Sequence, residues 1–519
     1  MRNILVQILI LFPLVFFAQK HDVTVNNTVT GIILRDSSEI RATEYVFPEK
    51  IYNTYLDSAS GLITLQLRDT RKNGKYLKNK GHIYVYDLNN KKVKWNDKIN
   101  YGTSSLKQFG DILLLRSASR SYLTDINTGE KLGELNAVLY YIDPVARTGM
   151  GYKRNVNSGF SDKFRGINID TGKFLWERNI SRKYGWNDAL KLNDSILLIV
   201  AEGLHSVNIK NGKGWDYNTV TGKKDYTGVV AANVAGAALG ILTGTYFISS
   251  GPDVITELVS NVFIDSSYIY FSSAEQLAKV DIKSGKTAWI YPFRKKLAGK
   301  SVVFCDEDKV YMINKAYGFT GYRKQPYGKP FIAAFDKKNG KEYYFSTIGE
   351  KNNPINDVFV ENGEICLIFK DRAARYSQTT GSLISEKVFD NGELGMLNFF
   401  IGKQVFVKNN YGEYVSLSET DSSNVYIFTT EGKILSVDKF FNISEVRDID
   451  DLYVLYLKKE NFGFIANKNS TYIINEKGEK IAELNADSDS FISGNIFYSI
   501  FNKSIFTVDL SKILTSGFK

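Results

Sequence analysis

The fold of this 519-residue chain is decided by the stretch Asp281-Ile282-Lys283-Ser284-Gly285-Lys286-Thr287-Ala288-Trp289. An Asp side chain accepts hydrogen bonds from backbone groups two residues further on and so opens a turn. Gly285 supplies the positive φ that ends a type I turn with a bulge, so the chain reverses as a hairpin. Trp289 then offers a large surface for burial against a neighbouring unit.

The same unit recurs along the chain at blade-like spacing. The turn-opening residues are Asp87, Asp125, Asn168, Asn208, Asp281 and Asp336, the turn glycines are Gly129, Gly172, Gly212, Gly285 and Gly340, and the tryptophans after the turns are Trp95, Trp176 and Trp289. Lys91 stands where the first copy lacks its glycine, and weaker copies end at Gly381, Gly432 and Gly478. Positions 129, 172 and 212 lie 43 and 40 residues apart. A period of about 40–45 residues is typical of four-stranded propeller blades.

Composition agrees with an all-β fold. The chain holds 32 Tyr, 33 Phe and 41 Gly, which suits many short strands joined by tight turns. We therefore predict a single large β-propeller of four-stranded antiparallel blades. Nine turns and a tenth hairpin-like segment at 491–510 allow up to ten blades.

The pattern Asp/Asn-x-x-x-Gly-Lys-x-x-x-Trp resembles the pyrroloquinoline quinone (PQQ)-like repeat propellers, and the resemblance extends from Ile51 to about Leu514. This family includes quinoprotein alcohol dehydrogenases and the propeller lipoprotein of the outer-membrane assembly machinery. Most of its members have eight blades, so the resemblance implies eight, against the ten that the repeats allow. The turn motif itself says little about activity.

The two ends of the chain carry separate predictions. Residues 1–18 have a positive start at Arg2 and an apolar run from Ile4 to Phe17, which predicts a signal peptide cleaved after Ala18. The protein is therefore expected to be exported, and to be periplasmic, outer-membrane associated or extracellular. Residues 19–47 form an N-terminal segment that could complete the last blade and close the ring. Residues 48–519 form the propeller.

One insertion, at 226–256, breaks the repeat. No charged residue occurs from Tyr226 to Pro252, and glycines recur every four residues at 236, 240 and 244. Two interpretations stay open: packing on the propeller face, and contact with a protein partner or with the membrane surface. A spanning helix would place the two halves of the propeller on opposite sides of a membrane. The candidate contact residues are Val229, Val230, Leu239, Ile241, Leu242 and Phe247.

A second insertion, Lys315–Lys329, mixes aromatic and basic side chains. It is either a solvated loop with packed tyrosines or a binding site for a glycan or an anionic polymer.

The sequence contains few residues of the types that usually carry out catalysis. The chain has 3 His and 2 Cys, and the sequence shows no haem motif, phosphate loop or zincin motif. His205 is expected to be a packed or surface residue rather than a ligand. Cys305 and Cys366 are predicted either to pair or to remain buried thiols. We predict no catalytic, cofactor-binding or metal-binding residues.

Two functional interpretations follow. The first is an exported, non-catalytic scaffold that binds a protein or other envelope components as a monomer within a complex, without cofactor or nucleic acid. The net charge of +10 is spread over the turns rather than gathered in one run. The second is a PQQ-dependent dehydrogenase-like enzyme, which the absence of an adjacent cysteine pair disfavours.

Overall fold

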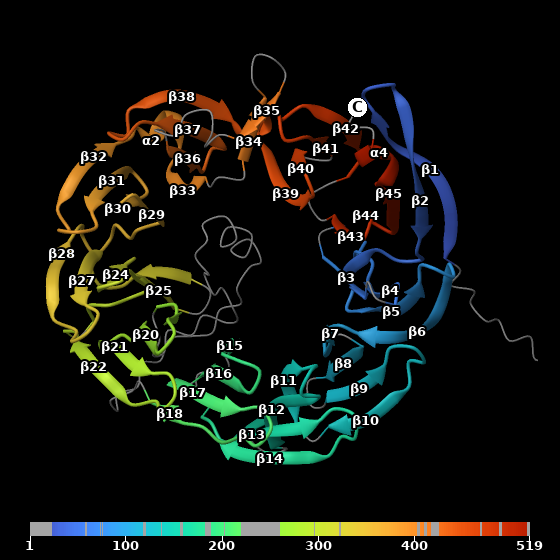
Figure 1. Cartoon of the computed structure of the whole chain (residues 1–519), viewed down its shortest axis with the longest axis horizontal. Coiled ribbons are helices and arrows are strands. Elements are labelled where there is room, and N and C mark those ends of the chain that lie inside the picture. The colour runs from blue at the N-terminus through green and yellow to red at the C-terminus, as the bar shows by residue number, and fades with distance from the viewer. Residues whose placement is uncertain are drawn as a thin grey trace, which may run out of the picture.

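Ten four-stranded antiparallel units form a ring in the part of the chain that the computed structural model describes (Figure 1). The structure describes residues 23–57, 60–72, 74, 76–109, 111–117, 121–135, 137–155, 159–181, 188–201, 203–218, 260–294, 296–320, 323–401, 405–408, 413–416, 425–467, 470–486 and 490–515. Eight units are separate four-stranded sheets, and two more belong to one eleven-stranded sheet. The repeat count therefore gives the right blade number, and the family's usual eight is wrong here.

Blades 1 to 5 follow one another along the chain. Their strands are β3 (Ile51–Asp57), β4 (Leu62–Leu67), β5 (Lys80–Asp87) and β6 (Lys92–Asn100); β7 (Ser104–Phe109), β8 (Ile112–Ser117), β9 (Ser121–Asp125) and β10 (Lys131–Leu135); β11 (Val138–Asp143), β12 (Thr148–Asn155), β13 (Gly159–Asn168) and β14 (Phe174–Asn179); β15 (Asp188–Lys191), β16 (Ile196–Ala201), β17 (Gly203–Asn208) and β18 (Asp216–Tyr217); and β19 (Phe263–Ile264), β20 (Tyr268–Ser272), β21 (Gln276–Asp281) and β22 (Thr287–Pro292).

Blades 6 to 10 carry two inserted hairpins, β25–β26 and β34–β35. Their strands are β23 (Ser301–Cys305), β24 (Lys309–Asn314), β25 (Tyr317–Thr320), β26 (Arg323–Pro326), β27 (Phe331–Asp336) and β28 (Glu342–Thr347); β29 (Asp357–Glu361), β30 (Glu364–Ile368), β31 (Arg372–Ser377) and β32 (Leu383–Val388); β33 (Leu397–Ile401), β34 (Val405–Lys408), β35 (Tyr414–Ser416), β36 (Val425–Thr429), β37 (Lys433–Val437) and β38 (Ile443–Asp448); β39 (Tyr453–Lys459), β40 (Phe462–Asn467), β41 (Ser470–Ile474) and β42 (Lys480–Leu484); and β43 (Phe491–Ser493), β44 (Ile496–Phe501) and β45 (Ser504–Asp509). The short helices are α2 (Asn391–Leu394), η1 (Ile449–Asp451) and α4 (Ser511–Thr515).

The N-terminal hairpin closes the ring. Strands β1 (Thr24–Ile33) and β2 (Ser38–Val46) lie on the outer rim (Figure 1). β2 pairs with β45, Thr43 opposite Thr507, and so is the fourth strand of blade 10. β1 continues the sheet and pairs with β42 of blade 9 through Gly31–Ile33. One sheet therefore spans both sides of the closure.

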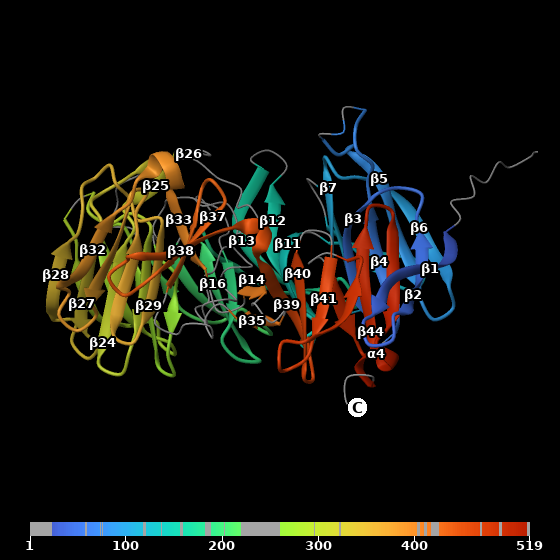
Figure 2. The same cartoon turned by 90° about the horizontal axis from the view of Figure 1, so that it is seen from above.

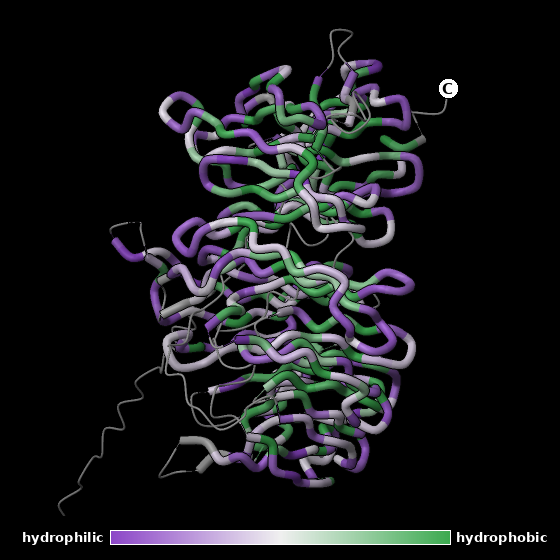
Figure 3. Tube along the Cα trace, turned by 90° about the vertical axis from the view of Figure 1, so that its left-hand side faces the viewer, coloured by the Kyte–Doolittle hydropathy of each residue, from purple (hydrophilic) through white to green (hydrophobic). Residues whose placement is uncertain are grey.

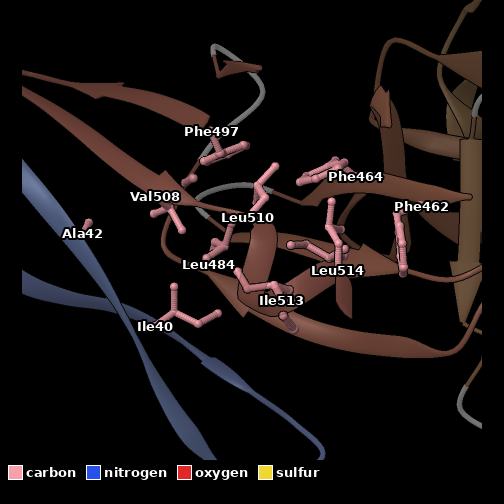
Figure 4. Packing of buried hydrophobic residues seen from close by; sticks show 13 residues of the cluster. Ile40, Ala42, Phe462, Phe464, Leu484, Phe497, Val508, Leu510, Ile513 and Leu514 are labelled. Carbon is pink, nitrogen blue, oxygen red and sulfur yellow. The ribbon is translucent and has the colours of Figure 1, made fainter. Parts of the chain in front are cut away.

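Apolar side chains fill every seam between neighbouring blades. Seen edge-on, the strands run through the thickness of the ring (Figure 2), and a hydropathy view from the side shows hydrophobic strand centres with many hydrophilic turns (Figure 3). At the seam between blades 9 and 10, Ile40 of β2 packs with Phe464, Phe497 and Leu510 (Figure 4). At the closing seam, Tyr45 of β2 packs among residues of blades 10 and 1. Burial at these seams is the main stabilising contribution.

The seam between blades 8 and 9 is built differently. The β34–β35 hairpin leaves blade 8 after β33, and β34 pairs with β39 of blade 9. Val405 and Val407 pack toward blade 8, whereas Tyr414 packs toward blade 9. The hairpin therefore acts as a wedge of two extra strands, which the repeat pattern did not predict.

Candidate interaction site

Each turn of the motif has the same hydrogen bonding. The Asp281 carboxylate accepts from the backbone N–H of Lys283 at 3.2 Å and of Ser284 at 2.7 Å, and the Gly285 N–H donates to the Asp281 carbonyl at 2.9 Å. Gly285 has φ 69°. Turns opened by Asp125, Asn168, Asn208 and Asp336 repeat these bonds. In the first copy Asp87 accepts from Asn90, and Lys91 takes the positive φ of 53° that glycine takes elsewhere.

The aromatic after each turn docks on the turn of the next blade. The indole Nε1 of Trp95 donates to the Ile126 carbonyl at 2.8 Å, that of Trp176 to Ile209 at 2.9 Å, and that of Trp289 to Lys337 at 3.1 Å. Trp215 and Tyr344 dock in the same manner, on the carbonyls of Ile282 and Gln378. Each ring covers the turn glycine of the next blade, namely Gly129, Gly212, Gly285, Gly340 or Gly381. Five seams thus share one contact.

This contact between an aromatic ring and the turn of the next blade is absent where the sequence lacks the aromatic residue. Between blades 2 and 3 the docking position is Gly133, and the side chain nearest to Gly172 is Leu135, 3.9 Å from where a Cβ would lie. Between blades 7 and 8 the position is Ser385, whose hydroxyl donates to the Lys439 carbonyl at 3.1 Å. The interpretation of Gly432 as a motif turn is wrong, because Gly432 joins the second and third strands of blade 8. The corresponding turn starts at Asp438, and Phe441 takes the positive φ.

The titratable candidates lie within the blades. His205 is 3% exposed, and its Nδ1 lies 2.6 Å from Asp216 Oδ1. Burial raises the pKa of Asp216, but the His205 hydrogen bond and the Arg178 charge outweigh it and leave that pKa below its usual value. Cys305 and Cys366 are free thiols in different seams. In the part of the chain that the structure describes, no three His, Cys, Asp or Glu residues gather into a metal site.

A hollow lies where the inner strands of blades 10, 1 and 2 meet. Its volume is about 450 Å³, and it is lined by Thr54, Tyr55, Leu56, Asp57, Gln108 and Phe491. The Tyr55 hydroxyl donates to the Leu106 carbonyl at 3.3 Å, and burial raises the pKa of Tyr55. The lining combines apolar faces with a single carboxylate. It could accept a small side chain or a ligand, and the six described residues of its lining include no nucleophile–base pair.

The outer strands β32 and β38 of blades 7 and 8 are neighbours on the rim of the ring (Figure 1), and these strands and the turn before β38 carry six exposed apolar side chains. We call this surface the rim patch; its members are Leu383, Ile384, Val388, Phe440, Ile443 and Val446, which are 36–67% exposed. The two blades meet there through Lys387, whose Nζ donates to Asn442 Oδ1 at 3.0 Å. Exposed apolar side chains on neighbouring strands are one feature of protein contact sites.

Some sequence candidates cannot be placed. The insertion at 226–256, with Val229, Val230, Leu239, Ile241, Leu242 and Phe247, lies outside the described residues, as does the signal peptide. The second insertion is in part the β25–β26 hairpin, in which Lys324 Nζ lies 4.1 Å from the centre of the Tyr317 ring. Among the helices that the structure describes, none is long and apolar enough to cross a membrane.

A model of a known protein family matches the part of the chain that holds these repeats. Residues 79–291, from β5 to β22, fit the family model described as outer membrane protein assembly factor BamB. Over residues 79–291 the chain therefore matches the PQQ-like repeat β-propellers. No curated protein matches the sequence of this propeller.

Several solved structures are similar to this chain at low identity. BamB from Moraxella catarrhalis is 14% identical, with a TM-score of 0.32, and the alignment covers 74% of this chain and 95% of that one. A eukaryotic initiation factor is 11% identical, with a TM-score of 0.33 and coverages of 93% and 98%. The computationally designed Ika8 protein is 10% identical, with a TM-score of 0.29 and coverages of 81% and 100%.

Sequence reasoning missed two features of this propeller. The hollow combines residues 54–57 with Gln108 and Phe491, and only ring closure brings these segments together. The rim patch had a weak signal, since apolar residues alternate poorly along β32 and β38 and leave both faces partly apolar.

Proposed function

We propose that this protein is an exported, non-catalytic scaffold that binds a protein partner in the cell envelope. The match of residues 79–291 to an outer-membrane assembly factor carries the proposal. That match supports binding and assembly as the general role. Export, the absence of catalysis and the identity of the partner go beyond it.

The mechanism is display by a rigid ring. Where an aromatic docks, it fixes one blade against the turn of the next. At the seam of the rim patch, which has no such aromatic, Ser385 and Lys387 make the contacts to the turn of blade 8 instead. A preorganised surface loses little conformational entropy when a partner binds. The rim patch is the surface that we assign to the partner, because its two strands are coupled through Lys387 and Ser385 to the turn of blade 8.

The enzyme alternative has little support from the residues present. A PQQ site of the dehydrogenase kind would use an adjacent cysteine pair, and Cys305 and Cys366 lie 61 positions apart in different seams. The hollow offers Asp57 as its one carboxylate, and this group accepts from the Ser60 hydroxyl at 2.6 Å. We therefore propose that the protein uses no cofactor.

Two experiments test the proposal. Titration of the purified protein with PQQ and calcium, followed by absorbance, is expected to show no saturable change; saturable binding with dye-linked oxidation of an alcohol would overturn the non-catalytic role. Fractionation of the native cells with N-terminal sequencing is expected to find the chain in the envelope, starting after Ala18. An intact, cytoplasmic chain would overturn export.

A further inference from the structure

Strand β1 is longer than the edge that it covers. It pairs with β2 from Thr24 to Ile33, but with β42 only at Gly31–Ile33. The Asn485 N–H reaches the Thr30 carbonyl at 2.7 Å and marks the end of that contact. Among the strands that the structure describes, none pairs with Thr24–Val29 on the side away from β2. Six residues of β1 therefore form an open sheet edge.

The sequence of this open edge lacks the residues that usually protect one. Natural proteins block exposed edges with lysine, proline, charge or a covering loop, because unpaired backbone groups invite another strand. From Val23 to Leu34 the chain has no charged residue and no proline. Val25 is 38% exposed and Val29 is 44% exposed. They lie at i and i+4 with Asn27 between them, so all three share one face.

The edge is also complementary to itself. Around Asn27 the sequence reads Val25-Asn26-Asn27-Thr28-Val29. An antiparallel pairing of two copies centred on Asn27 places Val25 of each copy opposite Val29 of the other and Asn27 opposite Asn27. Valine fits the pleated surface of a sheet, and two facing Asn side chains can exchange amide hydrogen bonds, so both kinds of pair favour such a ladder.

We propose that the free edge of β1 binds the same edge of a second copy of this chain, forming a dimer with twofold symmetry. The eleven-stranded sheets of the two rings then join through an antiparallel β1–β1 ladder. A twofold axis through Asn27 makes the contact self-complementary, as closed dimers require. This replaces the expectation of a monomer within the complex, and it leaves the rim patch of both copies open.

Cysteine cross-linking tests the register. In the proposed pairing the two Asn27 Cα atoms lie about 4.5–5.5 Å apart, within the span of a disulfide. The Asn27→Cys variant of the full mature chain should form a disulfide-linked dimer under mild oxidation. The control, Ser38→Cys, places an exposed thiol at the far end of the same hairpin and should not. Equal dimer yields for both variants, or none for Asn27→Cys, would overturn the proposed register.

Sedimentation of the purified chain tests the dimer without cross-linking. Val25→Lys/Val29→Lys places lysines opposite each other in the ladder and should raise the dimer dissociation constant about tenfold or more. The control, Val145→Lys, changes a valine that is 80% exposed in a turn of blade 3, and should leave it unchanged. Unaltered melting of each variant shows that the fold is retained. A chain that stays monomeric, or that needs a different protein strand on this edge, contradicts self-pairing.

Discussion

The indole ring of Trp289 in blade 5 lies directly on Gly340 in the turn of blade 6. A Cβ placed on Gly340 would come within 2.7 Å of Trp289 Cδ2, and Gly340 has φ 74°. Glycine is therefore required at this position for two reasons, backbone conformation and space. The same relationship joins Trp95 with Gly129 and Trp176 with Gly212.

The Gly340→Ala substitution separates these two reasons. The positive φ alone should cost about 1 kcal/mol of unfolding free energy, and displacement of the indole should add about 1–3 kcal/mol. Gly363→Ala is the matched control, because Gly363 has φ 76° but no atom within 4 Å of the point where its Cβ would lie. Denaturant unfolding of both variants measures the difference. Equal losses would show that the Trp289 contact contributes nothing.

A disulfide across the closure should form readily. Thr43 of β2 and Thr507 of β45 are directly opposite each other, and opposed residues in antiparallel strands have Cα separations that a disulfide can bridge. The Thr43→Cys/Thr507→Cys variant should oxidise and melt at a higher temperature than its reduced form, because the cross-link restricts the unfolded chain. Thr43→Cys alone is the control. A pair that does not oxidise contradicts the pairing of β2 with β45.

The two native cysteines should behave as thiols of low reactivity. Burial raises the pKa of Cys305 to about 12 and that of Cys366 to about 11, so at pH 8 little reactive thiolate is present. The thiols of the native chain should react slowly with a thiol reagent. The unfolded chain should show two reactive thiols without added reductant. Thiols that become titratable only after reduction would reveal a disulfide.

Stability should fall in acid. A hydrogen bond from the Ser284 hydroxyl lowers the pKa of Asp281, and one from the Asn339 N–H lowers that of Asp336. A carboxyl with a lower pKa in the folded state stabilises the fold above its unfolded pKa of about 4, and this stabilisation is lost as the pH falls through the folded pKa. The melting temperature should therefore drop below pH 4. Asp281→Asn/Asp336→Asn keeps the Oδ1 acceptor of each turn without a titratable group and should show a smaller drop; an unchanged pH dependence would contradict this cause.

Local chemistry explains why the sequence predicted so much of the fold. Turns opened by Asp or Asn, glycines at positive φ and aromatics four residues later depend on neighbours in the chain, so their spacing predicts blades. The pattern fails at Phe441. There a bulky residue takes the positive φ of the turn in blade 8, so the usual glycine is missing and the repeat cannot be recognised in the sequence. The β34–β35 wedge and the hollow beside Tyr55 depend on contacts between distant segments. No local sequence pattern predicts the hairpin or the hollow.

The central claim, that the ring binds a protein through the rim patch, is tested most directly by amine cross-linking in the native envelope. Lys387 and Lys439 lie at the patch, so both should cross-link to a protein partner in the wild type. In Leu383→Glu/Phe440→Glu these cross-links should be lost, whereas a Val145→Glu control should keep them, with all three proteins melting alike. Identical cross-links in the rim variant and the control, or none at Lys387 and Lys439 in the wild type, would contradict the account.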